Sequence, residues 1–71
     1  MKYAVIDQTK SDWFEDVFDT EKQAIAHADY MWRIMAEYDK KRIEAFFVAS
    51  CELNEDGTVD YDSLKDIKVY V

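Results

Sequence analysis

One cysteine and one histidine, Cys51 and His27, are the side chains in this sequence best suited to nucleophilic catalysis. Cys51 lies in an apolar stretch with strand-like alternation, where a free cysteine packs as a small apolar side chain. A tetrahedral zinc site within one chain would need carboxylates to complete it, because no second cysteine or histidine is present. We therefore expect a non-enzymatic protein without a cofactor, a catalytic residue or a zinc site.

The stretch 52–63, with the sequence ELNEDGTVDYDS, resembles the twelve-residue calcium loop of the EF-hand family. The matching third, fifth, sixth and ninth positions are Asn54, Asp56, Gly57 and Asp60. The ends differ, since Glu52 replaces the usual aspartate and Ser63 stands where a bidentate glutamate closes the site. Two interpretations stay open: a degenerate calcium-loop module, or a plain β-turn around the only glycine.

A second group of side chains that could bind a ligand is a run of carboxylates between positions 12 and 21, which contains no Lys or Arg. Its members are Asp12, Glu15, Asp16, Asp19 and Glu21. One interpretation is a strand edge that is charged against aggregation. The other is an acidic docking stripe that mimics nucleic acid and inhibits a basic DNA- or RNA-binding protein.

The net charge of −7 opposes direct binding to nucleic acid, whose phosphates need Lys and Arg opposite them. It equally opposes docking on an anionic membrane. No apolar run approaches the roughly 20 residues that span a bilayer, and the N-terminal apolar stretch is too short for a signal peptide. A lone thiol is compatible with a reducing compartment, so we expect a cytoplasmic protein.

The element that must position these residues is one long helix over 20–42. Thr20 and Gln23 form a capping-box pattern at its start, and no Pro or Gly interrupts it. Lys and Arg at 40–42 suit its C-terminal end. Its apolar side consists of Ala24, Ile25, Ala28, Met31, Trp32, Met35, Ala36 and Tyr38.

Alternating apolar residues predict strands at 2–8, 13–18, 43–53 and 66–71, with a turn at 54–58. Residues 59–63 suit either a short irregular step or a single helical turn. The element order is β-β-α-β-β in a single domain over 1–71. This order predicts an α+β fold, with an antiparallel sheet of about four strands and the helix packed on one face.

A single helix covers only one face of a sheet, which leaves apolar side chains on the other face. We expect that uncovered face to carry Trp13, Val17, Phe46, Val48 and Tyr70. An apolar patch of this size indicates a partner, and an isologous homodimer is the commonest arrangement. Tyr30 and Ile34 fall outside the main apolar side of the helix and are candidates for a second contact surface.

The overall plan resembles small uncharacterised bacterial proteins that are often carried by mobile elements. The resemblance rests on the helix start Asp19–Ala24, the acidic turn Asp56–Asp62 and the closing strand Ile67–Val71. It implies the β-β-α-β-β plan and no known activity. The sequence thus predicts a homo-oligomeric, non-enzymatic protein-interaction module, with the acidic inhibitor and the calcium-loop module as alternatives.

Overall fold

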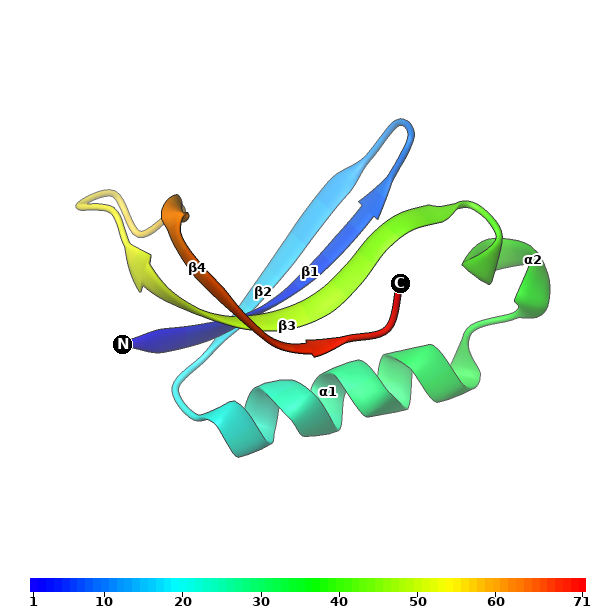
Figure 1. Ribbon diagram of the computed structural model, residues 1–71, viewed down its shortest axis with the longest axis horizontal. Coiled ribbons are helices and arrows are strands. Elements are labelled where there is room, and N and C mark those ends of the chain that lie inside the picture. The colour runs from blue at the N-terminus through cyan, green and yellow to red at the C-terminus, as the bar shows by residue number, and fades with distance from the viewer.

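The computed structural model describes all 71 residues, and its α+β architecture confirms the predicted fold class. The elements in chain order are β1 (Lys2–Thr9), β2 (Trp13–Phe18), α1 (Glu21–Ile34), α2 (Glu37–Lys40), β3 (Ile43–Leu53) and β4 (Val59–Val69). The four strands form one antiparallel sheet in the order β2-β1-β3-β4. Helix α1 lies along one face of this sheet, as Figure 1 shows. Neither helix is long and apolar enough to cross a membrane.

β1 and β2 form one antiparallel hairpin, β3 and β4 form a second, and β1 joins the two hairpins by pairing with β3. The β1–β2 hairpin closes where the Thr9 amide donates to the Asp12 carbonyl at 2.8 Å. The β3–β4 turn closes where the Asn54 amide donates to the Thr58 carbonyl at 2.7 Å. Gly57 has a φ of 87° in this turn, a conformation that side-chain-bearing residues rarely adopt. The predicted turn at 54–58 is therefore confirmed.

The helical region is broken in two, so the prediction of one helix over 20–42 is wrong. Met35 and Ala36 have extended backbones, with ψ angles of 132° and 151°. An unbroken helix over 20–42 would be about 35 Å long, whereas eight-residue β1 spans about 26 Å. Since Ile43 must pair with Thr9, the chain has to turn back before the helix outruns the sheet. Tertiary geometry overrides the helical propensity of this stretch.

The C-terminal region is also simpler than predicted, because one strand, β4, replaces the irregular step and the short final strand. The step survives as a wide bulge within β4. The pairs on either side of the bulge are Glu52 with Asp60 and Ser50 with Lys65. The four residues Tyr61–Leu64 therefore oppose the single residue Cys51. The Ser63 hydroxyl accepts the Glu52 amide at 2.8 Å, which satisfies a backbone donor that the bulge leaves without a strand partner.

The face of the sheet under α1 holds the main apolar core. Its buried members are Val5, Ala24, Ala28, Ile43, Phe46 and Val48. Tyr70 packs against this cluster and is partly buried. The prediction that Phe46, Val48 and Tyr70 populate the uncovered face is thus wrong. β3 is apolar on both faces, so its alternation alone does not say which face the helix covers.

The opposite face, which we call the far face, holds a second buried cluster of Ala4, Ile6, Cys51 and Val59. The wide bulge in β4 carries Tyr61 across this face to β2. There the Tyr61 and Trp13 rings meet edge to face, with centroids 5.3 Å apart and an interplanar angle of 71°. Tyr61 also donates its hydroxyl proton to Glu15 and accepts from Trp13 Nε1. We call this contact the Trp13–Tyr61 bridge; it covers part of the far face from within the chain.

Candidate functional site

A polar groove lies on the helix side of the β1–β2 hairpin, and Asp7 lies at its centre. The groove consists of two adjoining cavities of about 290 and 380 Å³, and Asp7 lines both. The smaller cavity is lined by Asp7, Thr9, Asp12, Met35, Asp39, Arg42 and Ile43. The larger one is lined by Val5, Asp7, Phe14, Glu15, Asp16, His27, Met31 and Phe46. We call the two together the hairpin groove.

Asp7 occupies a position where an apolar side chain would be expected. It follows Tyr3 and Val5 on the face of β1 that α1 covers. Its Oδ1 atom is the one buried side-chain oxygen or nitrogen in the protein that has no hydrogen-bond partner. Burial, and secondarily the charge of Asp16, raise the pKa of Asp7 above its usual value. An unpaired carboxylate oxygen in such a place is costly and calls for a cationic or hydrogen-bonding partner.

Asp16 and His27 form the wall of the larger cavity. Asp16 lies on β2 opposite Val5, two pairs along the hairpin from Asp7, and its Oδ2 atom lies 3.3 Å from His27 Nε2. The His27 ring also lies against Phe18, with centroids 5.1 Å apart. Phe14 and Met31 contribute apolar surface to the same cavity. The cavity therefore combines an apolar floor with carboxylates, which is the chemistry that suits the aliphatic stem and charged head of a long cationic side chain.

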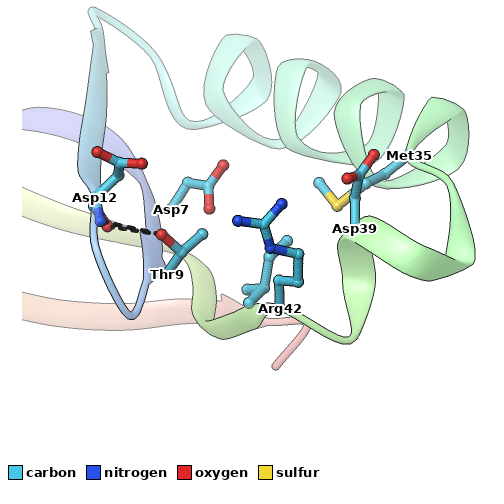
Figure 2. Close-up of a pocket in the computed structure, with 7 residues that line it drawn as sticks. Asp7, Thr9, Asp12, Met35, Asp39 and Arg42 are labelled. Carbon is cyan, nitrogen blue, oxygen red and sulfur yellow. Dashed lines mark hydrogen bonds between the residues drawn. The ribbon is translucent and has the colours of Figure 1, made fainter.

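Arg42 is the cation at the other end of the groove. Figure 2 shows its guanidinium pointing into the space between Asp7 and Asp39. None of the four ion pairs in the structure involves Arg42. Asp12 lies across the same cavity, where its amide donates to the Thr9 hydroxyl at 3.0 Å. The smaller cavity thus contains three carboxylates and one guanidinium that are not engaged with one another.

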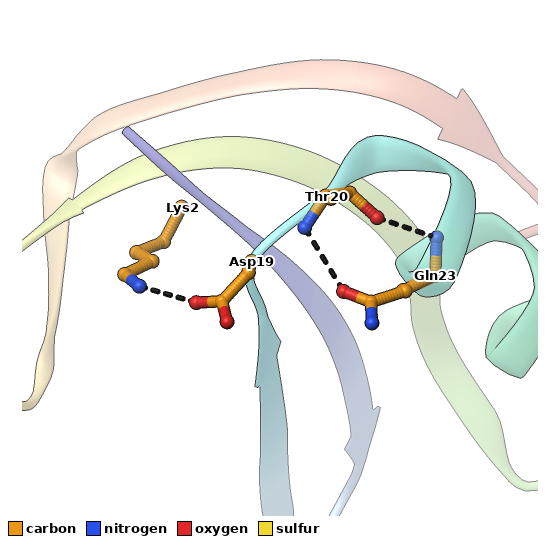
Figure 3. Close-up of polar contacts among 4 residues, drawn as sticks. All are labelled: Lys2, Asp19, Thr20 and Gln23. Atoms are coloured by element: carbon orange, nitrogen blue, oxygen red, sulfur yellow. Dashed lines mark hydrogen bonds and ion pairs between the residues drawn. The ribbon is translucent and has the colours of Figure 1, made fainter.

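The junction between β2 and α1 fixes the orientation of the helix beside the groove. The Gln23 amide donates to the Thr20 hydroxyl and the Thr20 amide donates to the Gln23 side chain, both at 3.2 Å (Figure 3). This reciprocal pair confirms the predicted capping box. Next to it, Asp19 forms an ion pair with Lys2, which lowers the pKa of Asp19 below its usual value.

The five carboxylates of the predicted acidic stripe follow β2 and its two ends, but they do not share one face. Asp16 and Glu15 both border the hairpin groove, but the Glu15 carboxylate lies on the far face, where it accepts from Tyr61. Asp12 lies at the hairpin turn and Asp19 at the junction with α1. Glu21 lies in the first turn of α1, where a negative charge suits the helix dipole.

The apolar residues predicted to contact a partner are divided among three places. Trp13 and Val17 are exposed on the far face, since Val17 is paired with the far-face residue Ala4. Phe46 and Val48 lie in the core, and Tyr70 packs beside them and donates to Asp29. Tyr30 and Ile34 are exposed on α1 away from the sheet. The five residues expected to form one patch are therefore not brought together.

Residues 52–63 form a β-hairpin turn between two strands rather than a loop between two helices. The Asp56 carboxylate accepts from the Thr58 amide at 3.1 Å and from the Thr58 hydroxyl at 2.6 Å. The Asp60 carboxylate accepts from the Asp62 amide at 3.1 Å. These oxygens stabilise the turn instead of converging on a common point, and no group of three or more His, Cys, Asp or Glu side chains is arranged to hold a metal ion.

Cys51 and His27, the two residues considered for nucleophilic chemistry, lie on opposite faces of the sheet. Cys51 is buried in the far-face cluster, and its burial raises the pKa of the thiol. His27 lies on α1 at the hairpin groove. The sheet therefore separates the two side chains.

The residues that sequence reasoning missed are Asp7, Asp39 and Arg42. The position of Asp7 could have been predicted from the sequence, because a carboxylate at 7 follows Tyr3 and Val5 on the apolar face of a strand. Asp39 and Arg42 reach the groove only because the helix breaks at Met35, and no residue of helix-breaking type marks that break.

Comparison with models of protein families, with curated proteins and with solved structures finds no match to this chain. The resemblance to mobile-element proteins stays a prediction.

Proposed function

We propose that this protein is a non-enzymatic interaction module that binds a basic segment of another protein through the hairpin groove. The observation that carries the proposal is the buried, unpaired Oδ1 of Asp7, which lies close to a second carboxylate, that of Asp16. A lysine ammonium or an arginine guanidinium from a partner would supply both the missing hydrogen bond and the compensating charge. The apolar floor of the groove would take the aliphatic stem of that side chain.

The overall charge supports the same class of partner. A net charge of −7 on 71 residues attracts a basic surface over long range and speeds its association. Proteins that bind DNA or RNA carry such surfaces because they must neutralise phosphates. A carboxylate-bearing hairpin that takes the place of those phosphates would act as an inhibitor of a basic nucleic-acid-binding protein.

The positions of the reactive side chains support a binding role over a catalytic one. Cys51 is buried on the far face, where the pKa of its thiol is raised and the thiolate nucleophile is disfavoured. His27, the base that could activate it, lies on the other side of the sheet. The groove presents several carboxylates, which can bind cationic side chains by charge and hydrogen bonds.

The test measures the affinity of a labelled oligolysine for the wild type and for two variants with equal net charge. Asp7→Asn with Asp16→Asn removes the groove carboxylates, whereas Asp62→Asn with Asp66→Asn removes two exposed carboxylates of β4. We expect the first pair to weaken binding at least about tenfold, because it leaves the cation unpaired in the groove. The control pair should change affinity less than about twofold, as rim charges do.

Added salt should weaken the binding of the wild type, since part of the attraction is between exposed charges. Equal losses of affinity for the two variants would mean that only the total charge attracts the probe. That result would overturn the groove as the binding site.

Self-association as a homodimer is a second candidate function, and exposed apolar side chains on the far face favour it. Trp13, Val17, Tyr61 and Val69 all remain exposed. Two chains of charge −7 repel each other, so screening by salt should strengthen a dimer while it weakens capture of a basic partner. Sedimentation equilibrium at low and high salt distinguishes the two. A mass that stays at 8.4 kDa at every concentration and salt level would exclude the dimer.

A further inference from the structure

β2 is an edge strand whose outer side is free. It is hydrogen-bonded to β1 alone, and none of the backbone hydrogen bonds outside the strand ladders and helices involves Trp13–Phe18. The Thr9 amide donates to the Asp12 carbonyl, and antiparallel ladders alternate from there. The amide and carbonyl groups of Trp13, Glu15 and Val17 therefore point outward. They form a row of unpaired donors and acceptors of the kind that a further strand can pair with.

The other edge, β4, is blocked by devices that β2 lacks. Two register shifts interrupt the pairing of β4 with β3, and the strand carries Lys65 and Lys68. Bulges and lysines are common means of keeping a strand edge from accepting another chain. β2 pairs with β1 without a shift over all its six residues and contains no Lys, Arg or Pro. One edge is therefore closed and the other is open.

The side chains along the open edge are apolar at its ends and acidic in its middle. Trp13 and Phe14 are 46% and 58% exposed, and Val17 is 40% exposed. Between them, Glu15 points to the far face and Asp16 to the helix side. An added strand would therefore meet apolar surface at both ends and one carboxylate on each face at its centre.

A second copy of this chain does not fit that edge. In an antiparallel pair of two β2 strands, residues whose backbone groups point outward must lie opposite one another. The two symmetric registers with the most paired residues are therefore centred on Glu15 and on Asp16. Either register sets identical carboxylates directly opposite each other, which is destabilising. The net charge of −7 on each copy adds to this repulsion.

We propose that β2 accepts an extended basic segment of the partner as a fifth strand of the sheet. This inference rests on the proposed function and specifies how the partner binds. The segment would place two consecutive basic residues opposite Glu15 and Asp16, with apolar or β-branched residues on both sides of them. Since neighbouring side chains of a strand point to opposite faces, the two cations reach the two carboxylates at once.

The basic residue on the helix side of the added strand would also reach the hairpin groove. Phe14 and Asp16 line that groove together with Asp7. Adjacent strands lie about 4.8 Å apart, so Asp7 on β1 would be two strand spacings from the added segment, within reach of an extended lysine or arginine. Strand pairing and occupation of the groove are therefore one binding event.

The ends of β2 limit how long the basic run can be. Lys10 lies at the hairpin turn just before β2, and Lys2 is paired with Asp19 just after it. A cation of the partner placed beyond either end of β2 would meet one of these lysines. A central basic pair therefore fits better than a uniformly basic segment.

The experiment titrates this protein with capped hexapeptides by calorimetry. The matched peptide is Thr-Val-Lys-Arg-Val-Thr, and its scramble, Lys-Val-Thr-Thr-Val-Arg, has the same composition and charge. Two further versions of the matched peptide carry backbone N-methyl groups, on the second and fourth residues or on the third and fifth. Alternate residues of a strand donate to one side, so only one of these methylated peptides loses its bonds to β2.

We expect the matched peptide to bind at least about tenfold more tightly than its scramble, and the two methylated peptides to differ by a similar factor. Glu15→Gln with Asp16→Asn should weaken binding of the matched peptide about tenfold, because both changes keep the acceptors but remove the charges. Glu55→Gln with Asp62→Asn, which removes the same charge elsewhere, should have little effect.

Each outcome decides a separate claim. Strand addition would be overturned if the matched and scrambled peptides bound with equal, salt-sensitive affinity and the two methylated peptides also bound equally. That result would leave the proposed binding of a basic segment by the acidic groove intact. Binding of oligolysine without binding of any hexapeptide would do the same. Absence of binding by both the peptides and oligolysine would overturn the proposed function, and the carboxylates of β2 would then serve only to protect the edge.

Discussion

The indole of Trp13 and the phenol of Tyr61 meet across the far face, although they stand 48 residues apart in the sequence. Trp13 begins β2 and Tyr61 lies in the bulge of β4, so the contact joins the two edges of the sheet. The Tyr61 hydroxyl also donates to Glu15, the residue that we place opposite a basic side chain of the partner. The bridge therefore links the stability of the far face to the geometry of the open edge.

Removal of the Tyr61 hydroxyl should destabilise the fold by a modest amount. Tyr61→Phe leaves Glu15 and the Trp13 indole without a partner but keeps the ring contact. We expect a loss of about 1 kcal/mol in the free energy of unfolding, or about 4–8 °C in Tm for a domain of this size. Thermal unfolding monitored by circular dichroism measures it. Tyr30→Phe on the exposed side of α1 is the control, and equal effects of the two changes would mean that the bridge does not stabilise the fold.

The same hydroxyl predicts a loss of stability at alkaline pH. Burial and the hydrogen bond to Glu15 raise the pKa of Tyr61 from 10.0 to about 12. The folded state therefore holds this proton more tightly than the unfolded state. The resulting stabilisation is fully present below pH 10 and is lost as the pH rises towards 12.

Urea unfolding at a series of pH values between 9 and 12 tests this prediction. The difference in unfolding free energy between the wild type and Tyr61→Phe should shrink across that range, because the variant has no phenol at 61 to titrate. A difference that stays constant with pH would show that Tyr61 titrates alike in the folded and unfolded states.

The capping box at the start of α1 should be a cooperative unit. Thr20→Ala removes the acceptor for the Gln23 amide, and Gln23→Ala removes the acceptor for the Thr20 amide. Each should cost about 1 kcal/mol of stability, with Thr20→Ser nearly neutral. A double-mutant cycle by chemical denaturation should show a coupling above zero, since the two side chains position one another. Strict additivity would indicate that the two hydrogen bonds form independently.

Much of the fold could be predicted from local sequence, because the signals for it are local. Strand β2 and strand β3 have the predicted bounds, and Thr20 caps the helix as its spacing with Gln23 indicates. The turn at Gly57 follows from a backbone conformation that other residues rarely adopt. These features depend on residues within a few positions of one another.

The features that could not be predicted depend on contacts across the molecule. The break at Met35 follows from the distance that the chain must travel back to β1, and nothing in the local sequence marks it. The wide bulge of β4 contains Tyr61, which contacts Trp13 on the opposite edge strand, so it depends on a contact between distant parts of the sequence. β3 is apolar on both sides, so the face of Phe46 is decided by packing against α1. The hairpin groove was missed for the same reason, since Arg42 lines the same cavity as Asp7 only because the chain turns back after α1.

Asp7→Asn should become more stable relative to the wild type as the pH rises. The same change should weaken binding of a basic partner. The pKa of Asp7 is raised in the folded state by burial and by Asp16. The folded state therefore binds this proton more tightly than the unfolded chain does. The stability that follows is present below the ordinary value of 3.8 and is lost as the pH rises through the folded-state pKa. Asp7→Asn has no carboxyl group to titrate at this position, so it does not undergo this loss of stability.

The measurement is the free energy of unfolding of the wild type and of Asp7→Asn at pH 3 and pH 7, by urea denaturation. The free energy of unfolding of the variant, relative to that of the wild type, should be higher at pH 7 than at pH 3. Any effect of the amide on packing is the same at both pH values and does not change this difference. Asp66→Asn, an exposed carboxylate without a hydrogen-bond partner, is the control and should show no such gain. A pH-independent difference for Asp7→Asn would mean that the carboxylate is already satisfied within the fold. The groove would then have no need of a cation, and the proposed binding of a basic partner would lose the observation on which it rests.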